Sequence, residues 1–365
     1  MSALFVLFCI AVAIQLIFFL VFSYGLSRKT ENGLPATPVS VIVCAHDEEQ
    51  NLRELIPLVL AQDYPEFEVI IVNDRSNDGT YDFLREAAAL QPKLRVVQVD
   101  HLPPHANGKK YGLTLAIKSA KHDVVLLTDA DCRPAGTGWI RTMMRSINAD
   151  TQFVLGYSPY KKLPGFLNLF IRFETLLTAL HYVGLARAGM PYMGVGRNLA
   201  YRKALFLENK GFNGYLHVTG GDDDLFVNQH ATSKNTRVCL AAEALVLSEP
   251  KRTWSEFFKQ KIRHLSVGKF YKFRHATVLA LYNLSQLMFW VTGILLVFDG
   301  YWAVWVLAAM VVRFAMFMLA VQQFSAQAGH KFEVWTVPLL DFLFTIYYIS
   351  TGTVALVSKK VQWKS

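Results

Sequence analysis

The sequence predicts an α/β protein in which a mostly parallel sheet is joined to membrane-spanning helices at both ends of the chain. Short apolar runs and amphipathic stretches alternate between residues 39 and 128, an order typical of parallel strands connected by crossover helices. Ala3–Phe22 is almost entirely apolar, and similar stretches lie at Thr277–Val297, Tyr301–Ala320 and Trp335–Val357. Each is long enough for a helix that crosses a hydrocarbon core of ~30 Å.

The elements of the sheet domain are expected after a linker at Gly33–Pro38. Strands are expected at Val39–Cys44, Val69–Val72, Leu94–Val99 and Val124–Thr128, and helices at Glu48–Ala61, Tyr81–Leu90 and Lys109–Ala120. Two longer helices, Phe166–Ala188 and Trp254–Arg274, carry charges that favour an interfacial position over a membrane span. In Trp254–Arg274, Phe258, Ile262 and Leu265 form the apolar stripe. The domains are therefore an anchor at 1–24, a sheet domain at 36–250, an interfacial helix at 251–275 and membrane helices at 277–358.

Basic residues flank the apolar segments, so the net charge of +9 indicates a membrane surface rather than a nucleic-acid partner. Arg28 and Lys29 follow the first segment and place the sheet domain in the cytoplasm. No basic residue precedes that segment and no small-x-small site follows it, which favours an uncleaved anchor. The four cysteines are expected to stay reduced there, without a disulfide. Lys359, Lys360 and Lys364 argue for a cytoplasmic C-terminus, so one C-terminal segment is expected to be interfacial or re-entrant.

Two charged residues, Arg313 and Asp341, lie inside the predicted C-terminal spans. A charge in hydrocarbon is costly, so these residues are expected to pair with each other or to face a cavity.

Asp129 and Asp131 follow the apolar strand that ends at Thr128. In extended chain alternate residues share a face, so both carboxylates can point at one ligand. Such a pair suits a hard divalent cation that also binds a diphosphate. A simple turn after the strand is the alternative.

Polar residues also follow the first two strands. Asp47 and Asp78 are most simply helix caps, but Asp74 lies at the strand edge, too early to cap the next helix. Lys109 precedes a helix whose first N–H groups can bind an anion. Neither a G-x-G-x-x-G nor a GxxxxGK[ST] pattern is present, which argues against a dinucleotide fold and a phosphate loop.

A run of three carboxylates, Asp222 to Asp224, precedes the expected helix Leu225–His230. Like charges repel, so burial of all three is not expected. Two readings remain open: a solvated acidic helix N-terminus, or one aspartate that acts as a general base.

In this order the motifs resemble those of membrane-bound family 2 glycosyltransferases, a group whose layout ceramide glucosyltransferases and polysaccharide synthases share. The motifs are Ala45-His-Asp-Glu-Glu, Asn73-Asp74-x-Ser76, Gly108-Lys109, Asp129-Ala-Asp131, Gly194-x-Gly-Arg197-Asn198, Gly221-Asp-Asp-Asp-Leu and Gln260-x-x-Arg263. The resemblance runs from Val39 to Arg263 and implies the GT-A fold, a Rossmann-like α/β fold.

The resemblance also implies roles for the donor-binding residues. Ala45, Asp47 and Glu48 line the nucleotide pocket, and Asp74 reads the nucleobase of a UDP- or GDP-sugar. Lys109 lies near the nucleotide or its phosphates, and Arg197 is a further donor-binding residue. Asp129 lies near the ribose and diphosphate, and Asp131, with Asp129, binds Mg²⁺ or Mn²⁺.

For catalysis, the resemblance implies that Asp222 is the base, with Asp223 as the close competitor because Gly221 replaces the usual acid. Gln260 and Arg263 match the Q-x-x-R-W motif, whose arginine approaches the leaving diphosphate. His264 stands where the family usually has tryptophan, which argues against polymer synthesis.

The expected activity is therefore an inverting, metal-dependent transfer of a sugar from a nucleotide-sugar to a lipid or lipid-linked acceptor. The protein is expected in a bacterial inner membrane with its catalytic domain in the cytoplasm. The alternatives are a processive polysaccharide synthase and a catalytically inactive membrane scaffold.

Overall fold

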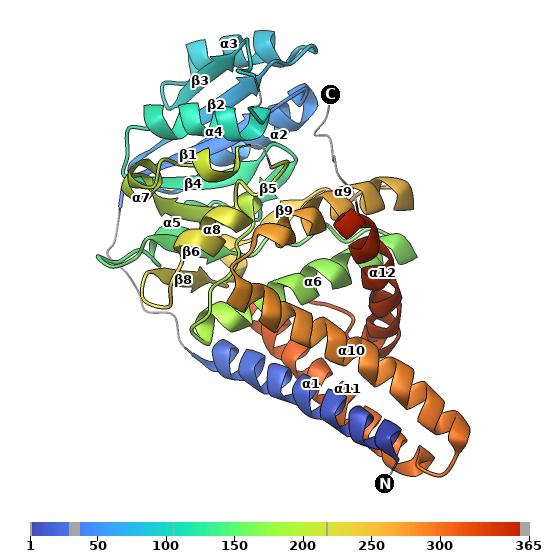
Figure 1. The fold of residues 1–365 in the computed structure, drawn as a ribbon. Helices are drawn as coiled ribbons and strands as arrows, with labels where there is room; N and C mark the ends of the chain where they lie inside the picture. The colour runs from blue at the N-terminus through green and yellow to red at the C-terminus, as the bar shows by residue number, and fades with distance from the viewer. Residues whose placement is uncertain (1, 29–36, 105, 217, 358–365) are drawn as a thin grey trace.

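A computed structural model describes residues 2–28, 37–104, 106–216 and 218–357. The expectations for Lys29, for most of the linker and for Lys359, Lys360 and Lys364 fall outside these residues. The sheet domain is built on a seven-stranded sheet with the strand order β3-β2-β1-β4-β7-β6-β8 (Figure 1).

The first half of this sheet is parallel, as the sequence predicts. Its strands are β1 (Val39–Ala45), β2 (Phe67–Asp74), β3 (Leu94–Val99) and β4 (Val124–Asp129). β1 pairs with β2 on one side and β4 on the other, in parallel register. Almost every residue of β1, β2 and β4 is buried, because crossover helices cover both faces of a parallel sheet.

The crossover helices are α2 (Glu49–Leu60), α3 (Thr80–Leu90) and α4 (Gly108–Ser119), within one residue of the expected bounds. α2 packs Leu52 and Leu55 against one face of the sheet. α4 packs Leu113 and Ile117 against the other. The loops that follow the strands therefore meet at one edge of the domain.

The second half of the sheet is mixed, and its strands are not among those predicted from the sequence. β7 (Leu199–Arg202) runs antiparallel to β4 and β6 (Phe153–Gly156), and β6 is parallel to β8 (Thr236–Cys239). A separate antiparallel pair joins β5 (Cys132–Pro134) to β9 (Val246–Ser248). Short helices complete the domain: α5 (Trp139–Met144), α7 (Lys203–Glu208), α8 (Asp224–His230), η1 (Gly196–Asn198), η2 (Asn213–Tyr215) and η3 (Ala242–Ala244).

α6 (Phe166–Arg187) lies between the sheet domain and the other long helices (Figure 1). The expected interfacial position is wrong, because most of its residues are buried inside the protein. Its charges have protein partners instead of water: Arg172 Nη2 lies 3.0 Å from Glu333 Oε2, and Glu174 Oε2 lies 2.5 Å from Lys261 Nζ.

α9 (Trp254–Val267) begins at a capping box formed by Thr253 and Glu256. It ends at Val267, earlier than the expected Arg274, because a short turn, η4 (Gly268–Phe270), separates it from the next helix. Its buried stripe is also not the expected one: Phe257, Lys261 and Val267 are buried, whereas Phe258, Ile262 and Leu265 are half-buried.

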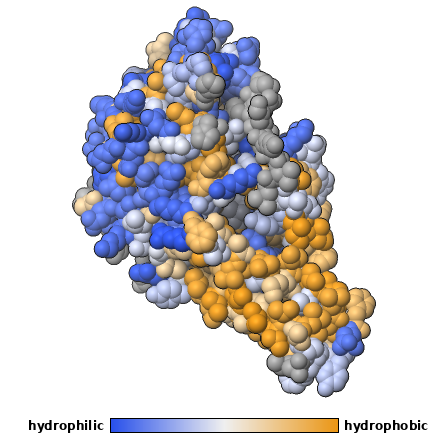
Figure 2. Space-filling model, in the orientation of Figure 1, coloured by the Kyte–Doolittle hydropathy of each residue, from blue (hydrophilic) through white to orange (hydrophobic). Residues whose placement is uncertain are grey.

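Among the described residues, five helices are long and apolar enough to cross a membrane. They are α6 and the helices α1 (Ala3–Ser27), α10 (Phe273–Asp299), α11 (Ala303–Ala328) and α12 (Val337–Val357), the last preceded by η5 (Val334–Thr336). Apolar residues dominate the surface of the helical end of the molecule, whereas the sheet end is mostly hydrophilic (Figure 2).

A fully buried ion pair joins the apolar helices and confirms the pairing expected for Arg313 and Asp341. Arg313 Nη1 donates to Asp341 Oδ2 at 2.7 Å, and Nη2 donates to Oδ1 at 3.1 Å. Gln286 and Trp290 of α10 also donate to Asp341, and Arg313 donates to Gln15 of α1. Four helices thus share one hydrogen-bonded network.

α12 returns towards the sheet domain instead of leading away from it (Figure 1). Its first turns place Asp341 beside Arg313, within α11. Two turns later the Tyr347 ring stacks on Phe257 of α9, with ring centroids 5.6 Å apart. α12 therefore runs from the centre of the helical bundle to α9.

Candidate active site

The candidate site lies where the parallel strands end. β1 lies between β2 and β4, so the chain leaves β1 on one side and returns on the other. At such a switch point a crevice for ligands opens outside the carboxyl ends of the strands. Ala45 pairs with Asn73, and Cys44 pairs with Asp129. The loops predicted to form the site are therefore neighbours.

Asp74, the expected nucleobase reader, is the last residue of β2 and is buried. Arg75 engages both oxygens of its carboxylate: Nε donates to Oδ1 at 2.7 Å and Nη2 to Oδ2 at 3.2 Å. Gly108 leaves room for this pair, since a Cβ there would come within 2.4 Å of Asp74 Oδ2. A ligand that binds Asp74 must compete with Arg75 or bind beside it.

Hydrogen bonds join the loop after β1 to the loop after β2. Asp47 N donates to Ser76 Oγ at 3.0 Å, and Asn77 N donates to Asp47 Oδ1 at 2.7 Å. Asp47 does not cap α2 as expected; Glu48 is the N-cap residue, and Asp47 has a φ of 54°. Asp78 does cap helix N-termini, because its carboxylate accepts hydrogen bonds from the first N–H groups of both α2 and α3.

Asp129 ends β4, and Asp131 follows it in a tight turn rather than in continuous extended chain. The two carboxylates still interact: burial, and then the charge of Asp129, raise the pKa of Asp131. Glu48 acts in the same direction, and Arg197 opposes it. Glu249 N donates to the Asp131 carbonyl oxygen at 3.3 Å, which fixes the turn against the end of β9.

Lys109, in the first turn of α4, joins two of the predicted aspartates. Its Nζ lies 3.0 Å from Asp129 Oδ1 and 3.0 Å from Asp222 Oδ2. Burial lowers the pKa of Lys109, but the charges of Asp129, Asp222 and Asp223 raise it well above its ordinary value. A charged ammonium therefore holds together carboxylates from two distant parts of the sequence.

The three consecutive aspartates are not a solvated helix end. Asp222 and Asp224 are only 5% and 8% exposed, which contradicts the expectation that the run stays out of the core. Each has its own partners: Asp222 has Lys109, Asp223 accepts from Gly196 N at 2.6 Å, and Asp224 accepts from the Tyr271 hydroxyl at 2.8 Å. Burial is possible because the repulsion is offset separately at each position.

The pKa values of the three carboxyl groups are shifted in different directions. Although burial raises the pKa of Asp222, Lys109 and Lys110 lower it overall. Burial and the neighbouring aspartates raise the pKa of Asp223, and they raise that of Asp224 well above its ordinary value. Asp222 thus has the lowered pKa of the run, and Lys109 joins it to Asp129 at the strand edge.

Two family models match this chain. Residues 40–185 match "Glycosyl transferase family 2", and residues 151–320 match "Glycosyl transferase family group 2". The chain carries family 2 glycosyltransferase domains. The two matches together contain the entire candidate site, from Ala45 to Arg263.

Parts of the chain are similar to proteins whose names describe transferases. "Probable glycosyltransferase YdaM" of Bacillus subtilis is 30% identical over 119 residues, which are 32% of this chain and 28% of that protein. The "Undecaprenyl-phosphate 4-deoxy-4-formamido-L-arabinose transferase" of Aeromonas hydrophila is 33% identical over 96 residues, or 26% of this chain and 28% of that protein. The aligned stretches thus span little more than a quarter of these relatives.

A solved structure extends the similarity to the whole fold. The mannosyltransferase PcManGT from Pyrobaculum calidifontis, in complex with GDP-Man and Mn²⁺, has a TM-score of 0.62 and 17% sequence identity, over 98% of this chain and 99% of that one. The GT-A fold expected for this glycosyltransferase is therefore confirmed.

The backbone explains why glycine replaces the usual acid before Asp222. Gly221 has a φ of +80°, a region that favours glycine. A Cβ at this position would also come within 2.6 Å of Leu225 Cδ1. A glutamate at residue 221 would therefore strain the turn that brings Asp222 to Lys109.

Arg197 lies in η1, with its guanidinium 4.7 Å from the centre of the Tyr160 ring. Its Nη1 is buried and has no hydrogen-bond partner in the described structure. Burial lowers the pKa of Arg197, but Tyr160, Cys132 and Asp131 raise it overall. A buried cationic donor without a partner suits a ligand with phosphate oxygens.

Gln260 and Arg263 lie on α9, and both are half-buried. Gln260 Oε1 is buried without a hydrogen-bond partner among the described residues. His264 is the next residue after Arg263. Desolvation, followed by the charges of Lys261 and Arg263 and then of Arg197 and Lys109, keeps the pKa of His264 well below its ordinary value. The charges of these four cations therefore act on one region.

The residues of the site can hold a divalent cation together with a ligand. Within the described residues, no group of three His, Cys, Asp or Glu side chains forms a complete metal cage. Mg²⁺ typically binds one or two carboxylates and completes its coordination with phosphate and water. Asp131 and Asp129 are two such carboxylates, and after burial the charge of Asp129 is the next cause of the raised pKa of Asp131.

Some residues of the site were not found from the sequence. Lys110 is fully buried, and its Nζ donates to the carbonyl oxygens of Tyr215 at 2.7 Å and Val218 at 2.6 Å. Tyr271 binds Asp224 from the turn before α10. Nothing in the local sequence distinguishes Lys110 from a solvated lysine, so only the fold reveals this role.

Proposed function

We propose that this glycosyltransferase transfers a sugar, with inversion, from a UDP- or GDP-sugar to a lipid or lipid-linked acceptor at the membrane surface. The observation that carries the proposal is the ion-paired cluster in which Lys109 joins Asp129 to Asp222. It brings a candidate diphosphate-binding edge and a candidate base within reach of one substrate. The proposal includes a bacterial inner membrane with the sheet domain on its cytoplasmic side.

Donor binding is assigned to the ends of the parallel strands. Asp74, with Ala45, Asp47 and Glu48 nearby, receives the nucleoside. Lys109, Arg197 and Arg263 donate hydrogen bonds to phosphate oxygens, where the planar guanidinium groups match the phosphate geometry. Asp131 and Asp129 would hold Mg²⁺ or Mn²⁺, which when bound acts as a Lewis acid towards the leaving diphosphate.

Asp222 is assigned the role of general base. It accepts the proton of the acceptor hydroxyl while the oxygen attacks the sugar carbon, and the nucleoside diphosphate leaves from the opposite side. Asp223 and Asp224 are engaged by Gly196 N and the Tyr271 hydroxyl. Within the run from Asp222 to Asp224 only Asp222 is then assigned to the reacting groups, and a single displacement with one base inverts the sugar carbon.

A lipid acceptor is supported by the position of the site next to apolar helices. α9 carries Gln260 and Arg263 and packs against α12. The relative from Aeromonas hydrophila names an undecaprenyl phosphate, a lipid, in its activity. Both observations favour an acceptor that stays in the membrane.

The proposal is tested by assaying the purified protein with UDP- and GDP-sugars, Mg²⁺ or Mn²⁺, and a bacterial lipid extract. We expect Asp222→Asn to keep metal-dependent donor binding, measured by thermal shift, but to lose transfer by about 10²–10⁴-fold, the usual worth of a positioned base. Asp223→Asn is the matched control, because asparagine preserves the N-cap of α8.

Each result has a distinct meaning. An active Asp222→Asn with an inactive Asp223→Asn moves the base by one residue. A ladder of products instead of one added sugar identifies a polysaccharide synthase. A chain that binds no nucleotide-sugar with Mn²⁺ is an inactive scaffold, and the proposed function then fails.

A further inference from the structure

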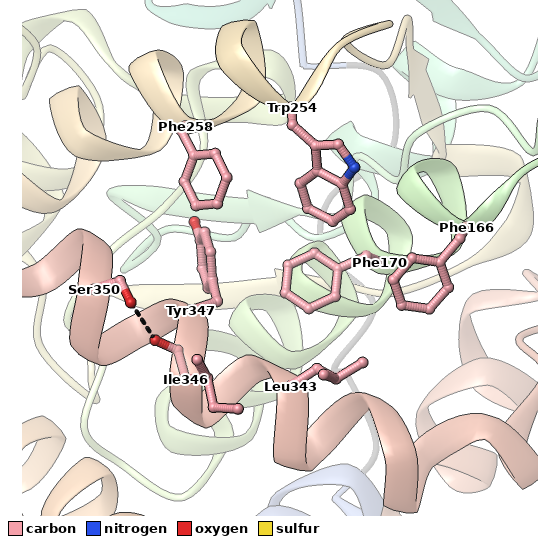
Figure 3. Close-up of a pocket in the computed structure, with 8 residues that line it drawn as sticks. All are labelled: Phe166, Phe170, Trp254, Phe258, Leu343, Ile346, Tyr347 and Ser350. Atoms are coloured by element: carbon pink, nitrogen blue, oxygen red, sulfur yellow. Dashed lines mark hydrogen bonds between the residues drawn. The ribbon is translucent and has the colours of Figure 1, made fainter.

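An apolar groove lies between α6, α9 and α12 (Figure 3). Its volume is about 210 Å³. Five aromatic rings form most of its wall: Phe166, Phe170, Trp254, Phe258 and Tyr347. In Figure 3 Trp254 and Phe258 of α9 lie on one side of the groove, and Leu343 and Ile346 of α12 lie on the other. The Phe170 and Tyr347 rings contact each other edge to face, with centroids 5.3 Å apart.

The groove suits hydrocarbon and does not suit a sugar or a nucleotide. The hydroxyl of Ser350 donates to the Ile346 carbonyl oxygen of its own helix at 2.8 Å and is not available to a ligand. The other lining residues, apart from the ends of Trp254 and Tyr347, are purely apolar. The volume is also below the ~300 Å³ at which sites for whole small molecules begin, so the groove holds only part of a ligand.

The groove is open to the surface that would face lipid. Ile346 is 49% exposed, and Phe166 and Trp254 are also exposed. α12 is one of the helices that are long and apolar enough to enter a membrane. The exposed part of the groove therefore includes α12, whose apolar composition suits contact with hydrocarbon.

One residue that lines the groove is close in sequence to residues that contact the candidate metal site. Glu249 N donates to the Asp131 carbonyl oxygen, and Lys251 is near enough for its charge to act on the Asp131 carboxylate. Trp254, which lines the groove, follows three residues later as the first residue of α9. The same short segment thus borders both the site and the groove.

We propose that this groove binds the hydrocarbon chain of a single-chain lipid acceptor, acyl or prenyl, with the acceptor hydroxyl held towards the candidate active site, where Asp222 is the proposed base. The inference rests on the proposed function and adds to it the place and chemical class of the acceptor. A two-chain membrane lipid, which would occupy the groove without being an acceptor, is the alternative that the test must exclude.

The test uses the full chain in phosphatidylcholine nanodiscs with a photoreactive monoacylglycerol that carries a diazirine in its acyl chain. Cross-links are mapped by mass spectrometry, with and without excess unlabelled monopalmitoylglycerol. We expect labelling to concentrate in residues 166–170, 254–258 and 343–350, and to fall when the competitor is added.

Two matched substitutions on α12 test the groove itself. Ile346→Trp fills it, whereas Ile349→Trp places the same ring on a similarly exposed residue (43% against 49%) outside the groove lining. We expect Ile346→Trp to weaken labelling about tenfold, the loss expected for about two buried methylene groups. Ile349→Trp should label as the parent chain does.

Donor binding is measured in the same variants by thermal shift with nucleotide-sugars and Mn²⁺, which also shows that each variant is folded. Three outcomes would overturn the inference and leave the proposed function intact. Labelling could spread evenly over α1, α10 and α11, could be unchanged by the competitor, or could change equally in both substituted proteins. Groove labelling in a protein that binds no nucleotide-sugar overturns the proposed function instead.

Discussion

Lys109 and Lys110 are neighbours in the sequence, but the fold gives them opposite surroundings. The charges of three aspartates keep Lys109 protonated between Asp129 and Asp222. Lys110 is turned into the protein, where its ammonium binds two carbonyl oxygens of the segment that precedes Asp222. One lysine therefore lies at the site, and the other holds the segment that leads to it.

Lys110 makes the stability of the fold depend on pH. Burial lowers the pKa of Lys110 from 10.5 to about 8, against the opposing charges of Asp222, Asp224 and Asp223. Between these two values the unfolded chain binds more protons than the folded chain, so the free energy of unfolding rises with pH in this window. We expect Lys110→Met to lose that rise.

The measurement is the unfolding midpoint in detergent at several pH values from 7.5 to 10. The slope against pH is compared between the parent chain and Lys110→Met, because the substitution also changes absolute stability. Lys118→Met, in the last turn of the same helix, is the control and should retain the slope of the parent chain. Equal slopes in all three proteins would contradict the role assigned to Lys110.

The sequence predicts which residues approach the site better than it predicts how they interact. Asp74 and Asp129 are recognisable because each ends an apolar strand, and parallel strands end at one edge. The bridge from Lys109 to Asp222 depends on how the second half of the chain folds back. The burial of Asp222 and Asp224 also escaped the sequence, because their partners Lys109 and Tyr271 are remote in the chain.

At the scale of elements, the ion pair of Arg313 and Asp341 has a measurable consequence. Removal of one partner leaves an uncompensated buried charge, which costs roughly 3–5 kcal/mol, whereas removal of both is often nearly neutral. We expect Arg313→Met and Asp341→Leu each to lower the detergent unfolding midpoint strongly, and the double variant to recover much of the loss.

The double variant should not recover completely, because Gln15, Gln286 and Trp290 lose their charged partners as well. The reciprocal swap, Arg313→Asp with Asp341→Arg, meets the same obstacle, since Gln286 and Trp290 would then face a cation with N–H donors. Single and double variants with simply additive losses would show that the pair has no coupling energy.

Elements were predicted well where the sequence pattern has one explanation. The apolar runs of β1, β2 and β4 fit only buried strands, and their crossover helices follow. β6 and β7 have only four residues each, too few for a clear period. α6 was misplaced because Arg172, Glu174 and His181 suggested water. In the fold, Glu333 and Lys261 pair with the two charges, and the His181 ring packs against Tyr282 at 4.2 Å.

At the scale of the whole molecule, the direction of α12 predicts the side on which it ends. The helix rises from Asp341, beside α11, to Tyr347, beside α9. We therefore expect Thr353→Cys to react with a membrane-impermeant maleimide on the same side of a sealed vesicle as Asp150→Cys in the sheet domain. Tyr301→Cys, in the exposed turn between α10 and α11, should react from the opposite side.

The labelling is done in a chain with Cys9→Ser and Cys44→Ser, which removes the two cysteines that are not buried. A Thr353→Cys variant that reacts together with Tyr301→Cys would mean that α12 crosses the membrane. In that case the groove between α9 and α12 would not exist in the membrane-bound protein.

The network around Arg313 also sets an order for assembly. Gln15 lies in α1, Arg313 in α11 and Asp341 in α12, so synthesis reaches these three residues in that order. Arg313 therefore has Gln15 available before its counter-charge, and α12 supplies that counter-charge. A chain cut between α11 and α12 would retain the Arg313 guanidinium without its carboxylate, an arrangement that is costly in an apolar bundle.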